Sequence, residues 1–274
     1  MIENFYRETL GKVVAFSHKH LGKVVAKYGY AIMTRRLGDD DVFFLNWGYE
    51  EDPPMDLKLD PADEPERIGI QLYHRVASQV DLKDKRVLEV SCGHGGAASY
   101  VMRYMHPASY TGLDLNPSGI EFCRRKHPLP GLAFLVGDAE NLPFPNDSFD
   151  AVINVEAAHL YPNYRTFLAQ VLRVLKPGGH FLYADLRGRD EVAQWEADLA
   201  QSGLEVVSCE DINKQVLRGL EKNSARYQEL VNRHAPRPFR RMGRDIAVTK
   251  GSPLYEEVER GDIVYRLYCL KKPE

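Results

Sequence analysis

The stretch Val87-Leu88-Glu89-Val90-Ser91-Cys92-Gly93-His94-Gly95-Gly96 decides the fold class of this 274-residue chain. Its apolar first half predicts a buried strand, and its three glycines predict a tight turn that opens a helix. Gly93 and Gly95 leave room for a ligand against bare backbone, and the N-terminus of the following helix offers unpaired N–H groups. About 20 residues further on, Asp114 ends a second strand, where a carboxylate suits the two hydroxyls of a ribose. This layout predicts a site for a nucleotide-type cofactor.

The details of the motif favour S-adenosylmethionine over a dinucleotide. The dinucleotide pattern is G-x-G-x-x-G, and this chain has Ala98 where the third glycine would fall. Glu89 also departs from the usual apolar strand, and it could hold the α-amino group of S-adenosylmethionine directly or through water. On this segment alone, a glycine turn that serves only strand-to-helix packing stays open.

Three further motifs follow in order and with matching spacing. They are Gly137-Asp138-Ala139-Glu140-Asn141-Leu142-Pro143-Phe144, Ser148-Phe149-Asp150-Ala151-Val152-Ile153-Asn154 and Val174-Leu175-Lys176-Pro177-Gly178-Gly179-His180-Phe181-Leu182. With them, the chain resembles the class I S-adenosylmethionine-dependent methyltransferases across roughly residues 66–210. Through segments 46–56, 155–159 and 265–269 it is similar to small-molecule O-methyltransferases of polyketide and lipid pathways, such as the phthiotriol dimycocerosate methyltransferases.

Alternating strands and helices predict an α/β fold with a parallel sheet covered on both faces. We expect strands at 86–91, 110–114, 132–136, 149–154, 179–185, 204–209 and 263–270, and helices at 67–80, 96–105, 117–127, 164–175 and 190–202. The resemblance implies a Rossmann-like, seven-stranded, mostly parallel sheet whose last strand is inserted antiparallel. We therefore expect an N-terminal helical lid and acidic loop (1–66), a cofactor-binding core (67–210), a helical cap insertion (211–262) and the last strand (263–274).

The first 36 residues form a segment apart. Gly11-Lys12-Val13-Val14-Ala15 recurs as Gly22-Lys23-Val24-Val25-Ala26, a step of about three helical turns that places both copies on one face. The segment carries seven Lys or Arg residues against two Glu. It is typical of an amphipathic helix packed over the core; a lid over an apolar substrate, or a surface that touches anionic membrane, stays open.

The resemblance also implies roles for individual residues. Glu89, Gly93 and Gly95 would hold the methionine part, Asp114 the ribose, and Asp138 with Ala139 the edge of the adenine. Further cofactor contacts are expected from Leu115 on the adenine face, from Asn154 at the end of the fourth strand, and from Trp47 and Tyr49 in an aromatic segment that closes over the cofactor. For Trp47 and Tyr49, simple anchoring of that segment to the core is an equal alternative. His94 is expected to shape the cofactor pocket.

His159 is the candidate general base. It follows the fourth strand by five residues, at the carboxyl edge where ligands bind in open α/β sheets. Histidine titrates near neutrality and can accept a hydroxyl proton. Asp185, at the end of the fifth strand, could orient the imidazole or take the proton itself. A structural role for His159 is the alternative.

These features predict an S-adenosylmethionine-dependent O-methyltransferase that acts on a hydroxyl of a large, partly apolar small molecule. N- or C-methylation stays open, whereas a nicotinamide oxidoreductase and a binding protein without activity are disfavoured. The net charge of −3 gives no electrostatic footprint for nucleic acid. The four cysteines have no metal-ligand spacing, no carboxylate cluster predicts a metal, and no apolar run is long enough to insert in a membrane. We expect a cytoplasmic protein and leave a homodimer open.

Overall fold

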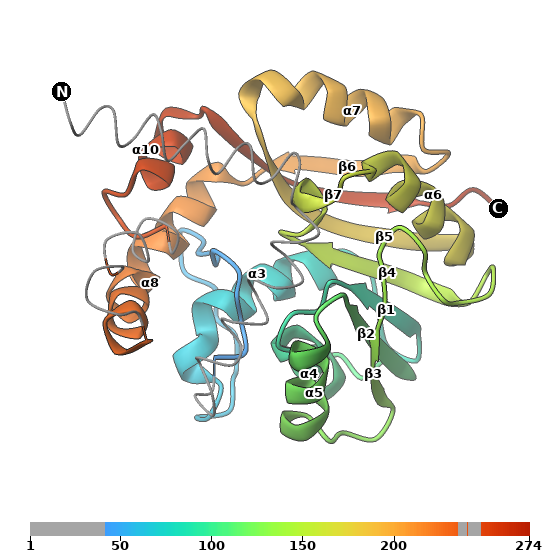
Figure 1. Ribbon diagram of the computed structural model, residues 1–274, viewed down its shortest axis with the longest axis horizontal. Helices are drawn as coiled ribbons and strands as arrows, with labels where there is room; N and C mark the ends of the chain where they lie inside the picture. Colours follow the sequence, from blue (N-terminus) through green and yellow to red (C-terminus); the bar gives the residue numbers. More distant parts are fainter. Residues whose placement is uncertain (1–41, 235–239, 241–247) are drawn as a thin grey trace.

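The computed structural model describes residues 42–234, 240 and 248–274, so the helix predicted within residues 1–36 lies outside the described residues. The described chain forms one seven-stranded sheet with the order β3-β2-β1-β4-β5-β7-β6 (Figure 1). The first five strands of this order are parallel to one another, and β7 runs antiparallel to both β5 and β6. The predicted Rossmann-like fold with an inserted antiparallel last strand is thereby confirmed.

The strands are β1 (Arg86–Val90), β2 (Ser109–Asp114), β3 (Leu132–Val136), β4 (Phe149–Val155), β5 (Leu175–Gly188), β6 (Glu205–Asp211) and β7 (Ile263–Lys271). The α-helices are α3 (Arg67–Ala77), α4 (Gly96–Tyr104), α5 (Pro117–Lys126), α6 (Tyr164–Val174), α7 (Val192–Ala200), α8 (Asn213–His234) and α10 (Pro253–Arg260). Short 3-10 turns are η2 (Glu64–Glu66), η3 (Ala158–Leu160) and η4 (Arg189–Glu191).

The central strands of the sheet are buried on both faces, and successive side chains of a strand point to opposite faces. Val87 belongs to one apolar cluster, with side chains of α3, α4 and α8, whereas its neighbour Leu88 belongs to a second cluster, with side chains of α6 and α7. Leu182 and Phe181 divide between the two clusters in the same way. The central strands β1 and β4 are therefore apolar along nearly their whole length, which is the pattern that a doubly covered parallel sheet requires, whereas the edge strands β3 and β6 are largely exposed.

Two elements begin two or more residues away from the predicted position. Strand β5 begins at Leu175 instead of residue 179, and it pairs with β4 through a register shift between Phe149 and Ala151. The Pro177-Gly178-Gly179 segment is thus an irregularity within the strand, with Gly178 at φ +74°, and it does not separate helix from strand. Helix α7 begins at Val192 because the 3-10 turn η4 occupies the residues before it.

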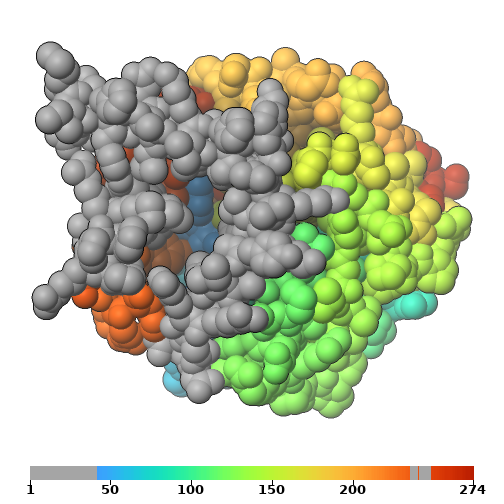
Figure 2. All heavy atoms as spheres, viewed as in Figure 1, coloured from blue at the N-terminus to red at the C-terminus, as the bar shows by residue number. Residues whose placement is uncertain are grey.

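Helices α8 and α10 fall within the range predicted for the cap. They contact each other and flank the same edge of the molecule as α3, and Figure 1 shows the segment of residues 42–50 running between α3 and α8. We call residues 42–50 the strap. The residues of β2 through α6 (green to yellow) form a continuous surface beside α7 in the space-filling view (Figure 2). Within the described part of the chain, no helix is both long and apolar enough to cross a membrane.

Candidate active site

A cavity lies at the carboxyl ends of β1, β2, β3 and β4, where ligands bind in open α/β sheets. It encloses about 1070 Å³ of space between atoms, including its opening to solvent. Its described wall comes from the strap, α3, the glycine turn and the ends of the strands: Phe43, Phe44, Leu45, Asn46, Tyr73, Ser91, Cys92, Gly93, His94, Ala97, Asp114, Leu115, Asn116, Gly137, Asp138, Ala139, Val155, Glu156, Ala157, Leu160 and Tyr161.

The glycine turn follows β1 in a conformation that favours glycine. Gly93 and Gly95 have φ of +54° and +76°. Within the described ranges, a Cβ on Gly93 would meet Leu45 alone, at 3.6 Å, so this glycine fits the role of leaving room for a ligand. A Cβ on Gly95 would lie 2.9 Å from the ring of Phe134 and 3.0 Å from Cys123 Sγ. Gly95 therefore permits close packing of the turn on β3 and α5, and it does not line the cavity.

Asp114 lies at the end of β2 and faces the glycine turn. Its Oδ2 accepts the Gly93 N–H at 2.9 Å, and its Oδ1 accepts the Asn116 N–H at 2.9 Å. Burial raises the pKa of this carboxyl, while these N–H groups oppose the rise. The carboxylate is fixed in the cavity wall in a position that suits the hydroxyls of a ribose.

Asp138 and Ala139 follow β3, and Leu115 follows β2 on the neighbouring strand. Asp138 Oδ1 accepts the backbone N–H of Glu140 at 3.0 Å, which fixes the turn that carries the carboxyl. All three residues line the cavity. The positions expected to contact the adenine are thus together, beside the position expected to contact the ribose.

Glu89 lies in the sheet beneath this cavity and does not line it. It is fully buried, Tyr110 donates to its Oε2 at 2.9 Å, and its Oε1 has no hydrogen-bond partner among the residues that the structure describes. Burial raises its pKa to about 7. A buried carboxyl oxygen without a donor is costly, and the α-ammonium group of S-adenosylmethionine is a donor of suitable charge. Together with the glycine turn and Asp114, this oxygen fits that cofactor.

Trp47 and Tyr49 lie in the strap outside the cavity wall. The Tyr49 ring is buried, its hydroxyl donates to Glu51 and its N–H donates to Ile68 O at 3.0 Å. The Trp47 ring packs near Tyr265, with ring centroids 6.2 Å apart. These contacts fit the anchoring alternative, because both side chains fasten the strap to the core.

Residues of the strap before Trp47 contribute to the wall instead. Phe43, Phe44, Leu45 and Asn46 line the cavity. Asn46 Nδ2 donates to Gly69 O at 3.0 Å, which ties the strap to α3. The sequence prediction missed this stretch, although its apolar and aromatic residues directly before the quoted Asn46–Asp56 motif were a usable signal.

Asn154, near the end of β4, is fully buried and does not line the cavity. Its Nδ2 donates to Val90 O at 2.8 Å and to the Tyr161 hydroxyl at 3.0 Å. The Tyr161 hydroxyl also lies 2.5 Å from Ser91 Oγ. Asn154 therefore contacts the cavity through Tyr161, which lines it.

His94 also lies in the cavity wall. It is buried, and its Nδ1 lies 2.8 Å from Val42 O in the strap.

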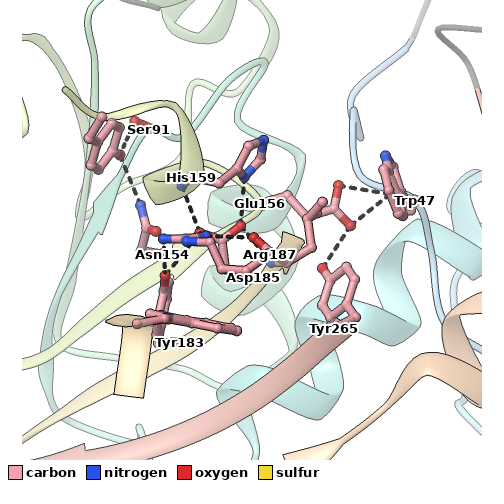
Figure 3. A network of polar contacts seen from close by, with 12 residues as sticks. Trp47, Ser91, Asn154, Glu156, His159, Tyr183, Asp185, Arg187 and Tyr265 are labelled. Atoms are coloured by element: carbon pink, nitrogen blue, oxygen red, sulfur yellow. Dashed lines mark hydrogen bonds and ion pairs between the residues drawn. The ribbon is translucent and has the colours of Figure 1, made fainter. Parts of the chain in front are cut away.

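His159 and Asp185 are brought together at this edge of the sheet, just outside the residues that line the cavity (Figure 3). Nδ1 of His159 lies 2.7 Å from Asp185 Oδ1, and the His159 side chain is 19% exposed. Asp185 is fully buried and also pairs with Arg187 at 3.0 Å. Despite burial, His159 and Arg187 hold the pKa of Asp185 below its usual range. Asp185 thus fits the orienting role and is a poor proton acceptor.

Glu156 is a wall residue to which the sequence prediction gave no role. It directly follows β4 with φ +50°, a conformation that is strained for a residue with a side chain. Trp47 N donates to its carboxyl oxygens at 3.0 Å, and the Tyr265 hydroxyl donates to its Oε1 at 2.7 Å. Burial raises its pKa to about 8. The usable signal was an acid immediately after an apolar strand.

No group of three or more His, Cys, Asp or Glu side chains in the described ranges is placed to hold a metal ion. All four cysteines, which lie in the described ranges, are free thiols.

Comparisons with known proteins agree with a cavity that binds S-adenosylmethionine. Residues 88–183 match the family model described as "Methyltransferase domain". The chain is 57% identical over 250 residues to a phthiotriol/phenolphthiotriol dimycocerosates methyltransferase of Mycobacterium tuberculosis, covering 91% of this chain and 93% of that protein. It is 52% identical over 247 residues to a fatty-acid O-methyltransferase of Mycolicibacterium smegmatis, covering 90% and 89%.

Among solved structures, the crystal structure of the [4+2]-cyclase SpnF superposes with a TM-score of 0.69 at 20% identity, covering 93% of this chain and 96% of that one. This likeness concerns the fold alone. The extent of the sequence identity and the matching cofactor motifs decide the assignment: the chain belongs to the S-adenosylmethionine-dependent methyltransferase family that includes the phthiotriol/phenolphthiotriol dimycocerosates methyltransferases.

Proposed function

We propose that this methyltransferase transfers the methyl group of S-adenosylmethionine to a hydroxyl oxygen of a large, partly apolar lipid or polyketide. The observation that carries the proposal is the His159–Asp185 pair, 2.7 Å apart, at the same sheet edge as the cofactor cavity. A hydroxyl must lose its proton when it is methylated, and an imidazole held by a carboxylate is suited to take it. The relatives named for phthiotriol dimycocerosates and for fatty acids support a lipid-like acceptor.

The cavity wall supports an apolar acceptor and the exclusion of water. Phe43, Phe44 and Leu45 of the strap contribute apolar surface on one side, and Leu160 with Tyr161 contribute it on another. Small-molecule sites typically combine such a wall with a few polar groups that fix orientation. Here those groups are Asp114 and Asp138 for the donor, with His159 next to the cavity.

The mechanism is an in-line displacement, in which bound S-adenosylmethionine supplies a methyl group on a sulfonium. Asp114 and Asp138 fix the donor, and the strap keeps water from the reacting atoms. Alignment of two bound reactants lowers a barrier by up to about 7–11 kcal/mol. His159 takes the hydroxyl proton at Nε2, while Asp185 holds Nδ1 and the ring orientation. General-base help contributes about 10²–10⁴-fold, so positioning is the larger contribution.

The test is a methylation assay with labelled S-adenosylmethionine and four acceptors of equal chain length: a primary alcohol, a 1,2-diol, a fatty acid and an amine. We expect a methyl ether from the alcohol or the diol, identified by mass spectrometry. The carboxylate of the fatty acid carries no proton to remove. His159→Ala should therefore lower the rate of ether formation from the alcohol or diol far more than the rate of any ester formation from the fatty acid. Methylation of the amine alone, or of the fatty acid alone, would contradict the proposal.

A further inference from the structure

The strand order assigns each part of the methyl donor to a place along the sheet edge. Asp138 follows β3, Asp114 ends β2 and Gly93 follows β1, and the order of these strands is β3-β2-β1-β4. Adenine, ribose and methionine positions therefore lie over β3, β2 and β1 in turn. The next strand is β4, and the first residue after it is Glu156, in the wall of the same cavity.

The carboxyl of Glu156 is fixed in place from two other parts of the chain. Trp47 N, in the strap, lies 3.0 Å from both carboxyl oxygens. The hydroxyl of Tyr265, on β7, donates to Oε1 at 2.7 Å. These two donors hold the carboxyl of Glu156 in place (Figure 3). Glu156 lines the cavity after β4, the strand next to β1, and so lies beyond the methionine position. Neither donor carries a positive charge.

We propose that Glu156 is the counter-ion of the donor's sulfonium, and that it thereby distinguishes S-adenosylmethionine from the neutral product S-adenosylhomocysteine. The carboxyl is protonated before the donor binds, because burial raises its pKa to about 8. A sulfonium in the same cavity favours the carboxylate, so the carboxyl releases its proton as the donor enters. The product lacks the charge and leaves the carboxyl protonated.

Several other titratable groups face Glu156. They are Asp185, Tyr265, Tyr73 on α3 and Tyr227 on α8, with His159 beside Asp185. Burial raises the pKa of each of the three tyrosines, so they stay neutral. The pKa of Asp185 is lowered, so it stays ionised. His159 is controlled for by repeating the experiment in a His159→Gln variant.

The experiment is calorimetric titration with S-adenosylmethionine and S-adenosylhomocysteine at pH 7, in buffers of different ionisation enthalpy. This measures protons released on binding and does not depend on catalysis. Any proton released by Glu89 or by the ligand's amino group is common to both ligands. In the wild type, we expect binding of S-adenosylmethionine to release about half to one proton more than binding of S-adenosylhomocysteine. In Glu156→Gln, we expect both ligands to release the same number of protons. Over pH 6 to 9, the ratio of the two affinities should shift about tenfold towards the methyl donor in the wild type.

Two further variants keep the test decisive. Tyr265→Phe removes a hydrogen bond that favours the carboxylate, so the extra proton release should move to higher pH. Glu221→Gln is the control, at an exposed position of α8 where Glu221 pairs with Lys250. It should leave the difference in proton release between the two ligands unchanged. Equal proton release with both ligands in the wild type, or the same excess in Glu156→Gln, would overturn the proposal. The acceptor is absent from this experiment, so its outcome is independent of whether oxygen is the methylated atom.

Discussion

Asp185 holds both the ring and the backbone of His159: its Oδ1 lies 2.7 Å from Nδ1, and its Oδ2 accepts the His159 N–H at 2.9 Å. The same Oδ2 accepts from the hydroxyl of Tyr183 and from Arg187. The carboxylate is therefore fixed on several sides, and so is the imidazole. In its proposed role as the base, His159 would need no rearrangement before it meets the acceptor.

Replacing His159 by alanine tests the base directly. We expect kcat to fall about 10²–10⁴-fold, the range of general-base help, while the Kd for S-adenosylhomocysteine stays within about twofold. Steady-state kinetics and calorimetry on the same preparation measure the two quantities. An unchanged kcat would mean that His159 has a structural role.

Asp185→Asn should cost both activity and stability. The substitution leaves the Arg187 guanidinium, whose side chain is 10% exposed, without its carboxylate, and breaking a buried ion pair costs about 3–5 kcal/mol. Denaturant unfolding measures the loss. The matched control is Asp198→Asn, which breaks the pair with Arg165, whose side chain is 64% exposed, and it should cost about 0–1 kcal/mol. Equal losses in the two variants would contradict the expected cost of the buried pair.

Asp114→Asn should weaken S-adenosylmethionine binding. The amide keeps the size of the carboxylate but offers one acceptor oxygen in place of two, so a ribose hydroxyl loses a charged partner. Loss of about 1.5–3 kcal/mol corresponds to a Kd raised about 10–100-fold. Asp150→Asn, which breaks the ion pair with Lys176 at the other end of β4, is the control and should leave the Kd unchanged.

Glu89 makes the stability of the cofactor-free protein depend on pH. Its pKa is raised from 4.5 to about 7, so the folded state holds a proton that the unfolded state releases. The contribution to stability therefore declines as the pH rises from 4.5 to about 7, and then levels off. We expect a loss of about 2–3 kcal/mol from this group. Unfolding curves between pH 5 and 8 should show a flatter profile for Glu89→Gln, and an identical slope would remove Glu89 as the cause.

Gly219→Ala tests the strap. A Cβ on this residue of α8 would lie 2.6 Å from Tyr49 N and 2.7 Å from the carbonyl carbon of Gly48. An alanine in a helix interior usually stabilises by about 0.5–1 kcal/mol over glycine, so a loss of stability reports the clash. We expect weaker cofactor binding as well, because the strap forms part of the cavity wall. Lys214→Ala, on the exposed side of α8, should change neither quantity.

The sequence predicts local features of this site well and long-range ones poorly. Gly93, Asp114 and Asp138 each follow or end an apolar strand, and the parallel order of those strands brings them to one edge. The contact between Glu156 and Tyr265 joins residues 109 positions apart on β4 and β7, and no local pattern encodes it. Gly95 shows a second limit. Gly93 leaves room for a ligand, and Gly95 leaves room for the ring of Phe134. The sequence cannot distinguish these two roles, because both require only that a Cβ is missing.

Strand β7 lies between β5 and β6, although it is the final strand along the chain. Until residues 263–271 are synthesised and inserted, β6 has no partner in the sheet, and the Glu156 carboxyl lacks the hydroxyl of Tyr265. A chain that stops before this strand would retain every cofactor motif and still lack part of the site. For this enzyme, a frameshift or truncation near the C-terminus should therefore be as damaging as a lesion in the glycine turn.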